Sequence, residues 1–402
     1  MFFGQLKLTA RMKVRFSLWD VYLACICLFP ISTIIFDESF VNKLIFGCLL
    51  ALQIFIFFLY PVKKSTLWAL ALLATSYVFS LSCTKFPLYN INLLIYFPFC
   101  LMYCYFMNDH HGSVIDWFYR NTYFVNAIVI LWSGIVGISI FLPSCYHVRE
   151  GGSLYFGSFC GSIFRLGPSA VFIQTLVILE QILYRKKYAI IYMVIPMYCF
   201  FMGSSRTYFV VGFCLFIISW FVFCRRRIVF WSTAIWLLLG LLLLVGTSAL
   251  GDKIAHTLDD TQYGDFWFRI TSSRSVIWSE NMQAWNEANT INKLFGSGFG
   301  FSYRTTGHWA HNDFIEILCS SGIFGLLLYI CSVCDLISKG CDKVHMPIYI
   351  KLCVFMTWFF NAFFNMFYVY FCAMLCYPFL LQVMKIYFSQ VNIEGKCERV
   401  SS

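Results

Sequence analysis

Long apolar runs, each about the length of a membrane-spanning helix, dominate this 402-residue chain. A helix that crosses the hydrocarbon core of a bilayer needs about 20 mostly apolar residues. The pattern predicts an all-α, polytopic integral membrane protein, a single domain over residues 1–402 with about twelve transmembrane helices. The predicted spans are 18–36, 43–61, 66–83, 88–107, 121–142, 166–183, 188–203, 207–223, 228–250, 312–336, 347–364 and 367–387.

Charge is too scarce in this chain to cover a soluble surface. Charged residues make up 12% of the sequence, whereas soluble proteins carry about 25%. The net charge of +10 would favour nucleic acid as a ligand of a soluble protein, but here the basic residues lie in short loops between apolar runs. Such loops set the orientation of a membrane protein, so no nucleic-acid partner is expected.

The 19 cysteines do not indicate a disulfide-rich protein. Most of them lie inside apolar runs, where cysteine behaves as a small hydrophobic residue. Cys145 and Cys160 share a polar loop, and their spacing leaves open whether they are bridged.

Basic residues predict which side of the membrane each loop faces. With a cytoplasmic amino terminus, the clusters at 63–64, 185–187 and 225–227 all face the cytoplasm, as the positive-inside rule requires. Both termini are then expected to be cytoplasmic. The first apolar run follows a basic start and lacks a small-residue cleavage site, which predicts an uncleaved signal anchor.

Two long loops, 143–165 and 251–311, are predicted on the outer face. Long loops in compact proteins are usually functional or disordered. The second contains Trp267, Trp278, Trp285 and Trp309. Disordered segments rarely carry so many tryptophans, so we expect an ordered loop. Helical spacing within it predicts an amphipathic helix over about 274–288 that lies in the membrane interface.

Three outer arginines stand where helices are predicted to start. Arg165 comes just before one span, Arg206 follows Ser205, and Arg274 follows Ser273. A helix N-terminus has unpaired N–H groups and a partial positive charge, and serine is a favoured cap there. Adding a guanidinium creates an anion site, and several converging ends would hold a diphosphate. The alternative for each arginine alone is an anchor for lipid headgroups.

Two histidines, His308 and His311, precede the span 312–336. Histidine exchanges protons near neutral pH, and a general base must be held in place. We expect His311 to project from the rigid start of this helix as a general base, the alternative being that it only caps the helix. His308 is expected to be an ordinary loop residue. No third ligand stands at metal-site spacing, so no metal is expected. The residues expected to support the base are Asn312, Asp313 and Glu316.

A Gly-x-Gly-x-Gly run comprises Gly296, Gly298 and Gly300. It does not follow a predicted strand and does not open a helix, so a dinucleotide site is excluded. We expect a tight turn whose backbone can approach a bulky ligand.

Together these residues resemble the O-antigen polymerase and ligase superfamily of bacterial inner-membrane proteins. The hydropathy plan, with a large outer loop before the third-last span, extends the match over the whole chain. The segments that carry the resemblance are Gly203-Ser204-Ser205-Arg206, Ser273-Arg274 with Ile277-Trp278, Gly296-Ser297-Gly298-Phe299-Gly300, Ala310-His311-Asn312-Asp313-Phe314, and Gly322-Ile323 with Gly325-Leu326.

The resemblance implies a metal-independent glycosyltransferase without a cofactor, placed in the bacterial inner membrane with its active site facing the periplasm. It would join undecaprenyl-pyrophosphate-linked oligosaccharide repeats into O-antigen or capsular polysaccharide. By analogy Arg206 and Arg274, and more weakly Arg165, would hold the donor pyrophosphate. His311 would deprotonate or orient the acceptor hydroxyl. The other partners it allows are membrane lipids and a chain-length regulator and a flippase of the same pathway.

Three alternatives stay open. The compact spacing from the glycine run to His311 favours a polymerase over an O-antigen ligase, which transfers the glycan to lipid A-core. The second alternative is a polysaccharide flippase or transporter, and the third is a noncatalytic scaffold. Ion-coupled transporters place ionisable groups near the bilayer midplane. This chain instead has its ionisable residues near the predicted span ends: Asp20, Glu180, Lys351 and Lys385.

Overall fold

The computed structural model describes residues 17–36, 40–64, 66–67, 71, 102–148, 154–203, 205–224, 230, 233, 250–251, 254, 268, 271, 274–298, 300–341, 346–365 and 375–388. Three predicted spans lie largely outside these residues, namely 66–83, 88–107 and 228–250, and so do the first eight residues of the span 367–387. Ser273, one of the expected helix caps, also lies outside them.

The protein is mostly helical, and five helices in the described ranges are long and apolar enough to cross a membrane. The expected all-α membrane protein is confirmed at this level. The five are α1 (Leu18–Phe36), α6 (Thr122–Ser139), α7 (Ile163–Leu183), α9 (Arg206–Cys224) and the part Asp313–Ser338 of α16 (Asp313–Cys341). Further apolar helices are α2 (Phe40–Leu59), α17 (Ile348–Phe364) and Leu375–Phe388.

One predicted span has a different form in the structure. The segment expected to cross the membrane over 188–203 is a 3-10 helix, η4 (Lys187–Met193), followed by the short α8 (Val194–Met202). Pro196 lies in the first turn of α8, where its missing N–H costs least, and this favours a helix start there. A short helix that was not predicted, α5 (His111–Arg120), precedes α6.

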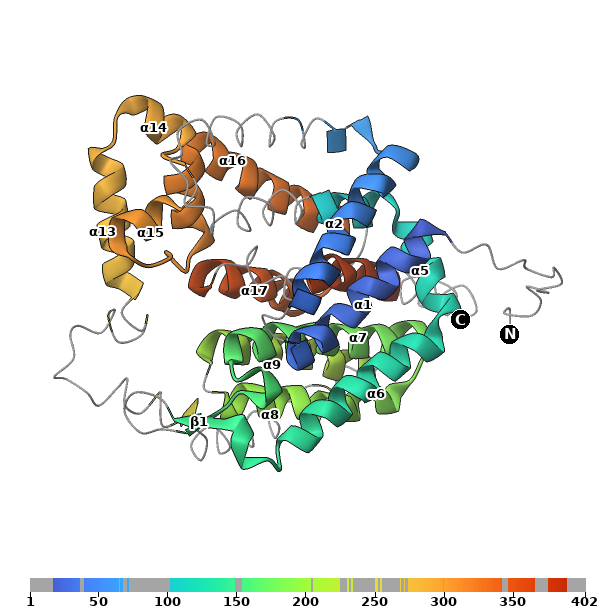
Figure 1. Ribbon diagram of the computed structural model, residues 1–402. Helices are drawn as coiled ribbons and strands as arrows, with labels where there is room; N and C mark the ends of the chain where they lie inside the picture. Colours follow the sequence, from blue (N-terminus) through green and yellow to red (C-terminus); the bar gives the residue numbers. More distant parts are fainter. Residues whose placement is uncertain are drawn as a thin grey trace.

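Helix α7 forms the centre of one half of the molecule. It is buried along its whole spanning window and packs against α1, α6, α8 and α9 (Figure 1). Glycine permits the close approach of α7 and α9, because a Cβ on Gly167 would lie 2.3 Å from the Tyr208 ring. Small residues at such contacts are typical of membrane helices, where close packing replaces a hydrophobic driving force.

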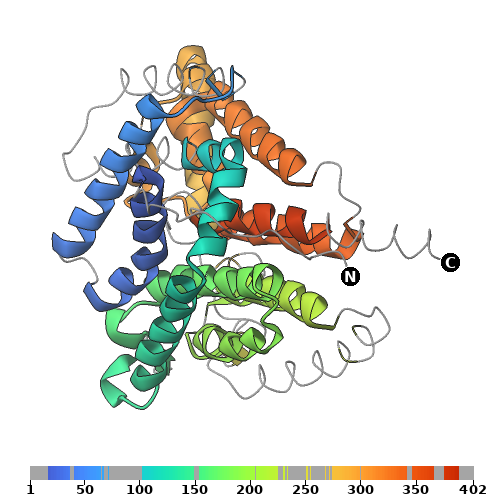
Figure 2. The same ribbon diagram turned by 90° about the vertical axis from the view of Figure 1, so that its right-hand side faces the viewer.

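Helix α17 connects this half to the rest of the protein. It packs along α9 in the antiparallel sense, with the rings of Phe221 and Tyr349 5.8 Å apart near one end. Figures 1 and 2 both show α17 between α16 and the pair formed by α7 and α9. At the other end of α17, Phe363 contacts Trp278 with ring centroids 5.3 Å apart.

The predicted outer loop 251–311 contains three helices in its described part. They are α13 (Arg274–Glu287), α14 (Thr290–Phe295) and α15 (Phe301–Thr306). Figure 1 shows them gathered at one end of the molecule beside α16. Helix α13 occupies the segment where the sequence predicts a helix over 274–288, and its location in a membrane interface stays a prediction.

The predicted loop 143–165 is compact where it is described. A 3-10 turn, η2 (Pro143–Cys145), leads into the antiparallel pair β1 (Tyr146–Val148) and β2 (Leu154–Phe156), in which Tyr146 faces Phe156. A second turn, η3 (Ser158–Cys160), precedes α7. Cys145 and Cys160 are both buried free thiols, so the structure has no bridge between them.

Candidate functional site

Helix α16 is broken at Gly322, where φ is 70° and ψ is −173°. The part Asp313–Ser338 has the length and apolar composition expected of the predicted span 312–336, but its helix is not continuous. The hydroxyl of Tyr329, beyond the break, donates to the Asp313 carboxylate at 2.6 Å. In a straight helix two residues 16 apart would be separated by about 24 Å. The first half of α16 therefore folds back towards the second half.

The glycine run supplies hydrogen-bond donors to the broken part of α16. The N–H groups of Ser297 and Gly298 donate to the carbonyl oxygens of Cys319 and Ser320, at 2.9 and 3.1 Å. A helix break leaves such carbonyls without intrahelical donors, and the loop supplies them.

Glycine is required on both sides of this contact. Gly296 has a φ of 93°, and a Cβ there would lie 2.0 Å from the Ser320 oxygen. A Cβ on Gly322 would lie 2.3 Å from the Leu294 oxygen. The backbone of the glycine run therefore approaches α16 closely, and its expected approach to a bulky ligand stays a prediction.

His311 lies in a left-handed turn before α16, with a φ of 48°. His311 stands two residues before the first residue of α16, Asp313, and its role as a general base stays a prediction. Asn312 is the cap: its side-chain oxygen accepts the N–H of Ile315 at 3.1 Å. Its carbonyl oxygen accepts the N–H of Glu316 at 2.9 Å. The cap and the imidazole are thus supplied by different residues.

Two side chains hold the residue before His311. The Glu316 carboxylate accepts the hydroxyl of Ser302 and, at 3.4 Å, the N–H of Ala310. The indole N–H of Trp278 donates to the Ala310 carbonyl at 2.7 Å. A left-handed conformation costs a residue with a side chain about 1–2 kcal/mol, and these contacts offset that cost. They fix the position of the imidazole relative to α13 and α16.

The electrostatic surroundings keep His311 neutral. Burial, the positive charge of Arg274 and the neighbouring His308 lower the pKa of His311 to about 4. Its buried Nδ1 has no hydrogen-bond partner within the part of the chain that is described. A neutral imidazole can accept a proton at pH 7. His308 itself is exposed, and its N–H donates to the Thr306 hydroxyl at 3.2 Å.

The other acidic residue of this segment faces the protein interior. Asp313 is fully buried, and its partner Tyr329 in turn accepts the indole N–H of Trp358 at 3.2 Å. Trp358 belongs to α17, so this chain of hydrogen bonds joins both halves of α16 to α17. Asp313 therefore stabilises the break in α16.

Arg274 is the first residue of α13 and belongs to the His311 site through its charge. The cap of α13 that the structure describes is Thr271, whose hydroxyl accepts the N–H of Ser275 at 3.0 Å. The carbonyl oxygen of Thr271 also accepts the N–H of Arg274, at 3.3 Å. The amino end of a helix carries a partial positive charge that favours an anion. An anionic ligand at Arg274 would therefore be stabilised both by this end of α13 and by the guanidinium.

Arg165 and Arg206 form a second group at the adjoining starts of α7 and α9. Each is two residues from the tight contact between Gly167 and Tyr208. The predicted serine cap of α9, Ser205, accepts the N–H of Phe209 at 3.0 Å through its carbonyl oxygen. Since α9 and α17 are antiparallel, the start of α9 lies at the same side of the molecule as the end of α17, on which α13 packs.

Sequence reasoning missed the residues that hold the imidazole. Trp278 stood on the predicted stripe of the 274–288 helix, but the stripe does not reveal its bond to Ala310. Ser302, Thr271 and Tyr329 act across 4 to 16 residues, and no local pattern marks them. Among the described residues, no group of three or more His, Cys, Asp or Glu could hold a metal ion.

No protein-family model, curated protein or solved structure matches this chain. The structure thus defines a helical membrane protein with a histidine and arginine site, and the assignment of its activity rests on the residues themselves.

Proposed function

We propose that this protein is an O-antigen or capsular polysaccharide polymerase with about twelve spans and both termini in the cytoplasm. It would join undecaprenyl-pyrophosphate-linked oligosaccharide repeats on the periplasmic face of a bacterial inner membrane. The observation that carries the proposal is the neutral His311, fixed by Glu316 and Trp278 through Ala310 and placed under the charge of Arg274. A base and an anion site side by side are what glycosyl transfer from a lipid diphosphate needs.

In the proposed reaction, an acceptor sugar hydroxyl attacks the anomeric carbon of the donor. The bond from that carbon to the phosphate oxygen breaks, and the diphosphate leaves with both electrons. The hydroxyl proton passes to the imidazole of His311. Arg274, with Arg206 and Arg165, stabilises the negative charge that develops on the leaving group.

Donor binding would also activate the base. Arg274 is one of the causes that lower the pKa of His311. A diphosphate bound to Arg274 would offset that positive charge, because an anion near an imidazole favours its protonated form. The pKa of His311 would then rise towards the pH at which the enzyme works. A base near neutral pKa is the more effective one, so the proposed site becomes competent only when the donor is present.

The test is the chain-length ladder of surface polysaccharide in cells that carry single variants. We expect Arg206→Ala, Arg274→Ala and His311→Ala each to abolish long chains while the protein still inserts. Lys187→Ala, which changes an exposed basic residue in η4, is the matched control and should leave the ladder unchanged. Normal ladders from all three site variants would contradict the proposal.

The same gel distinguishes a polymerase from a ligase. Loss of a polymerase leaves a single repeat on lipid A-core. Loss of a ligase leaves bare core together with stored lipid-linked polymer. A core with one repeat in the His311→Ala strain supports polymerisation.

One buried carboxylate favours a flippase or transporter as the second candidate. Glu180 lies near the carboxyl end of the spanning helix α7, as predicted, but it is fully buried and has no hydrogen-bond partner at either oxygen among the residues described. Ionisable groups buried inside membrane helices often belong to transport pathways. Loss of periplasmic lipid-linked repeats in a Glu180→Gln strain, with normal ladders from the His311 variant, would favour this alternative.

A further inference from the structure

A cavity with charged and aromatic lining residues lies at the end of the molecule formed by α5 and the start of α1, away from the His311 site. It has a volume of about 510 Å³, which is within the range of small-ligand sites. In Figure 1, α5 and α13 lie at opposite ends of the molecule. The cavity is lined by Ser17, Trp19, Asp20, Tyr60, Ser113, Asp116, Trp117, Tyr119 and Arg120.

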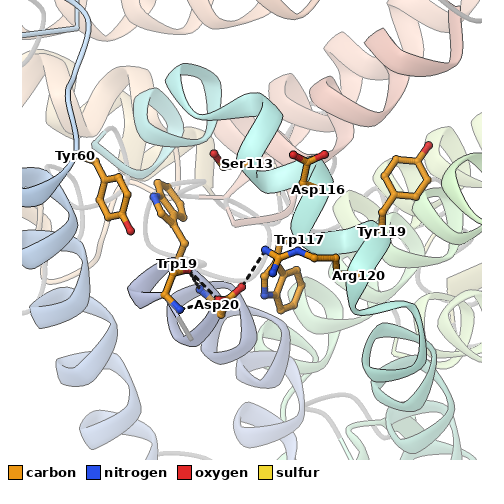
Figure 3. A pocket seen from close by; sticks show the side chains of 9 residues that line it. Trp19, Asp20, Tyr60, Ser113, Asp116, Trp117, Tyr119 and Arg120 are labelled. Atoms are coloured by element: carbon orange, nitrogen blue, oxygen red, sulfur yellow. Dashed lines mark hydrogen bonds and ion pairs between the residues drawn. The ribbon is translucent and has the colours of Figure 1, made fainter. Parts of the chain in front are cut away.

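One stripe of α5 supplies much of the polar lining. Ser113, Asp116, Trp117 and Arg120 are spaced three and four residues apart, so they share one face of the helix. Asp116 and Arg120 could pair at this spacing, but they do not. Figure 3 shows Arg120 reaching instead to Asp20, at 3.3 Å, while Asp116 points away from it.

The Asp20 carboxylate bonds to Arg120 and Ser17, whereas the Asp116 carboxylate has no such partner among the described residues. The Asp20 carboxylate also accepts the N–H and the hydroxyl of Ser17, at 2.8 and 2.9 Å. Asp116 is exposed and makes no hydrogen bond or ion pair with any described residue. Two carboxylates against one guanidinium give the cavity a net negative charge. The Asp116 carboxylate is therefore available to accept hydrogen bonds from a ligand. The Arg120 guanidinium has N–H donors in addition to the one that bonds to Asp20.

Aromatic side chains form the remaining walls. Trp19 contacts Tyr60 with ring centroids 5.9 Å apart, and its buried indole nitrogen has no hydrogen-bond partner within the described chain. Aromatic faces attract cations, and an unpartnered buried N–H favours an acceptor on a ligand. Tryptophan and tyrosine are also the residues that line the headgroup level of a membrane.

We propose that this cavity binds the zwitterionic headgroup of an ethanolamine phospholipid from the cytoplasmic leaflet. The primary ammonium would donate to Asp116 and lie against the aromatic walls. The phosphate would accept from Arg120 at the other end of the α5 stripe. Charge complementarity selects this occupant, because an anionic headgroup without an ammonium would meet the surplus carboxylate. The cavity lies beside the start of α1 and the end of α2. Ends of membrane-spanning helices lie at the level of the lipid headgroups, so a headgroup can reach it. This inference is independent of the proposed polymerase activity.

Native mass spectrometry of the delipidated full-length protein tests the inference. We expect phosphatidylethanolamine to bind about tenfold more tightly than phosphatidylglycerol, the value of one charge-assisted hydrogen bond. Asp116→Asn should remove this preference. Glu280→Gln, which changes an exposed carboxylate on α13 at the other end of the molecule, should keep it. An unchanged unfolding temperature of Asp116→Asn in phosphatidylglycerol would show that its fold is intact.

Three results would overturn the inference. The first is equal binding of the two phospholipids by the wild-type protein. The second is an unchanged preference in Asp116→Asn. The third concerns the source of the headgroup: if soluble phosphoethanolamine competes as strongly as the lipid, the cavity serves a free solute and not a membrane lipid.

Discussion

Tyr329 donates a hydrogen bond of 2.6 Å to Asp313, although both residues belong to α16 and stand 16 positions apart. The bond exists only because Gly322 breaks the helix between them. It fixes the first half of α16, whose amino end carries His311 and its cap. The histidine site is therefore built on a helix end that folds back towards the second half of its own helix.

Removal of the Tyr329 hydroxyl should destabilise the protein. In Tyr329→Phe the buried carboxylate of Asp313 loses a donor, and such a loss costs about 1–3 kcal/mol. Tyr123→Phe, which changes a tyrosine that is 90% exposed on α6, is the control. Thermal unfolding in detergent measures both, and equal midpoints would contradict the role given to this bond.

The glycine contact predicts a large difference between two chemically identical substitutions. Gly296→Ala places a methyl group 2.0 Å from a backbone oxygen of α16 and should prevent folding. Gly307→Ala also puts a side chain at a positive φ, 73° with a ψ of 0°, but in the left-handed helical region, and nothing lies within 4 Å of the new Cβ. It should cost only about 1–2 kcal/mol. Yields of folded protein on size-exclusion chromatography compare them, and similar yields would contradict the packing.

The bond from Trp278 to Ala310 predicts a loss of activity without a loss of fold. Trp278→Phe keeps an aromatic ring beside Phe363 but removes the indole donor at 2.7 Å from the carbonyl. The residue before His311 then loses one of its two restraints, and chain extension should fall several-fold. Trp285→Phe is the matched control, because the Trp285 indole nitrogen has no partner among the described residues. Equal activity of the two variants would exclude this restraint.

The lowered pKa of His311 predicts acid sensitivity. The folded protein binds this proton only near pH 4, whereas the unfolded chain binds it near pH 6.5. The unfolded state therefore holds more protons between these values. The stabilisation is fully present above about pH 6.5 and is lost as the pH falls to about 4. Stability measured across this range should fall less steeply in His311→Asn, which retains the left-handed turn. Identical slopes would show that His311 does not titrate as described.

The sequence allows much of the fold to be predicted, because span length and loop charge are local properties. The ends of α1 and α9 agree with the predictions to within a residue. The break at Gly322 could not be predicted, since an isolated glycine inside an apolar run is common in membrane helices. Its cause is the distant Gly296 loop, and contacts of that kind leave no periodic signal.

The candidate site was predictable in its residue types but not in its arrangement. Arg274 and His311 were predicted as site residues because each stands near the start of a predicted helix. In the structure the charge of Arg274 acts on His311. It assigned Asp313 and Glu316 alike to the support of the base. Their burial and partners separate them, since one bonds to Tyr329 and the other to Ser302. Which carboxylate faces which neighbour depends on tertiary packing that a sequence pattern does not contain.

His311 and the outer arginines are proposed to act together on one lipid diphosphate. The most direct test is chain extension by the purified protein in nanodiscs, with undecaprenyl-pyrophosphate-linked repeats as the only substrate and donor binding followed in parallel. We expect Arg274→Ala and Arg206→Ala to weaken donor binding, and His311→Asn to bind the donor but form no product. Full extension by His311→Asn, or unchanged donor binding by both arginine variants, would contradict this proposal.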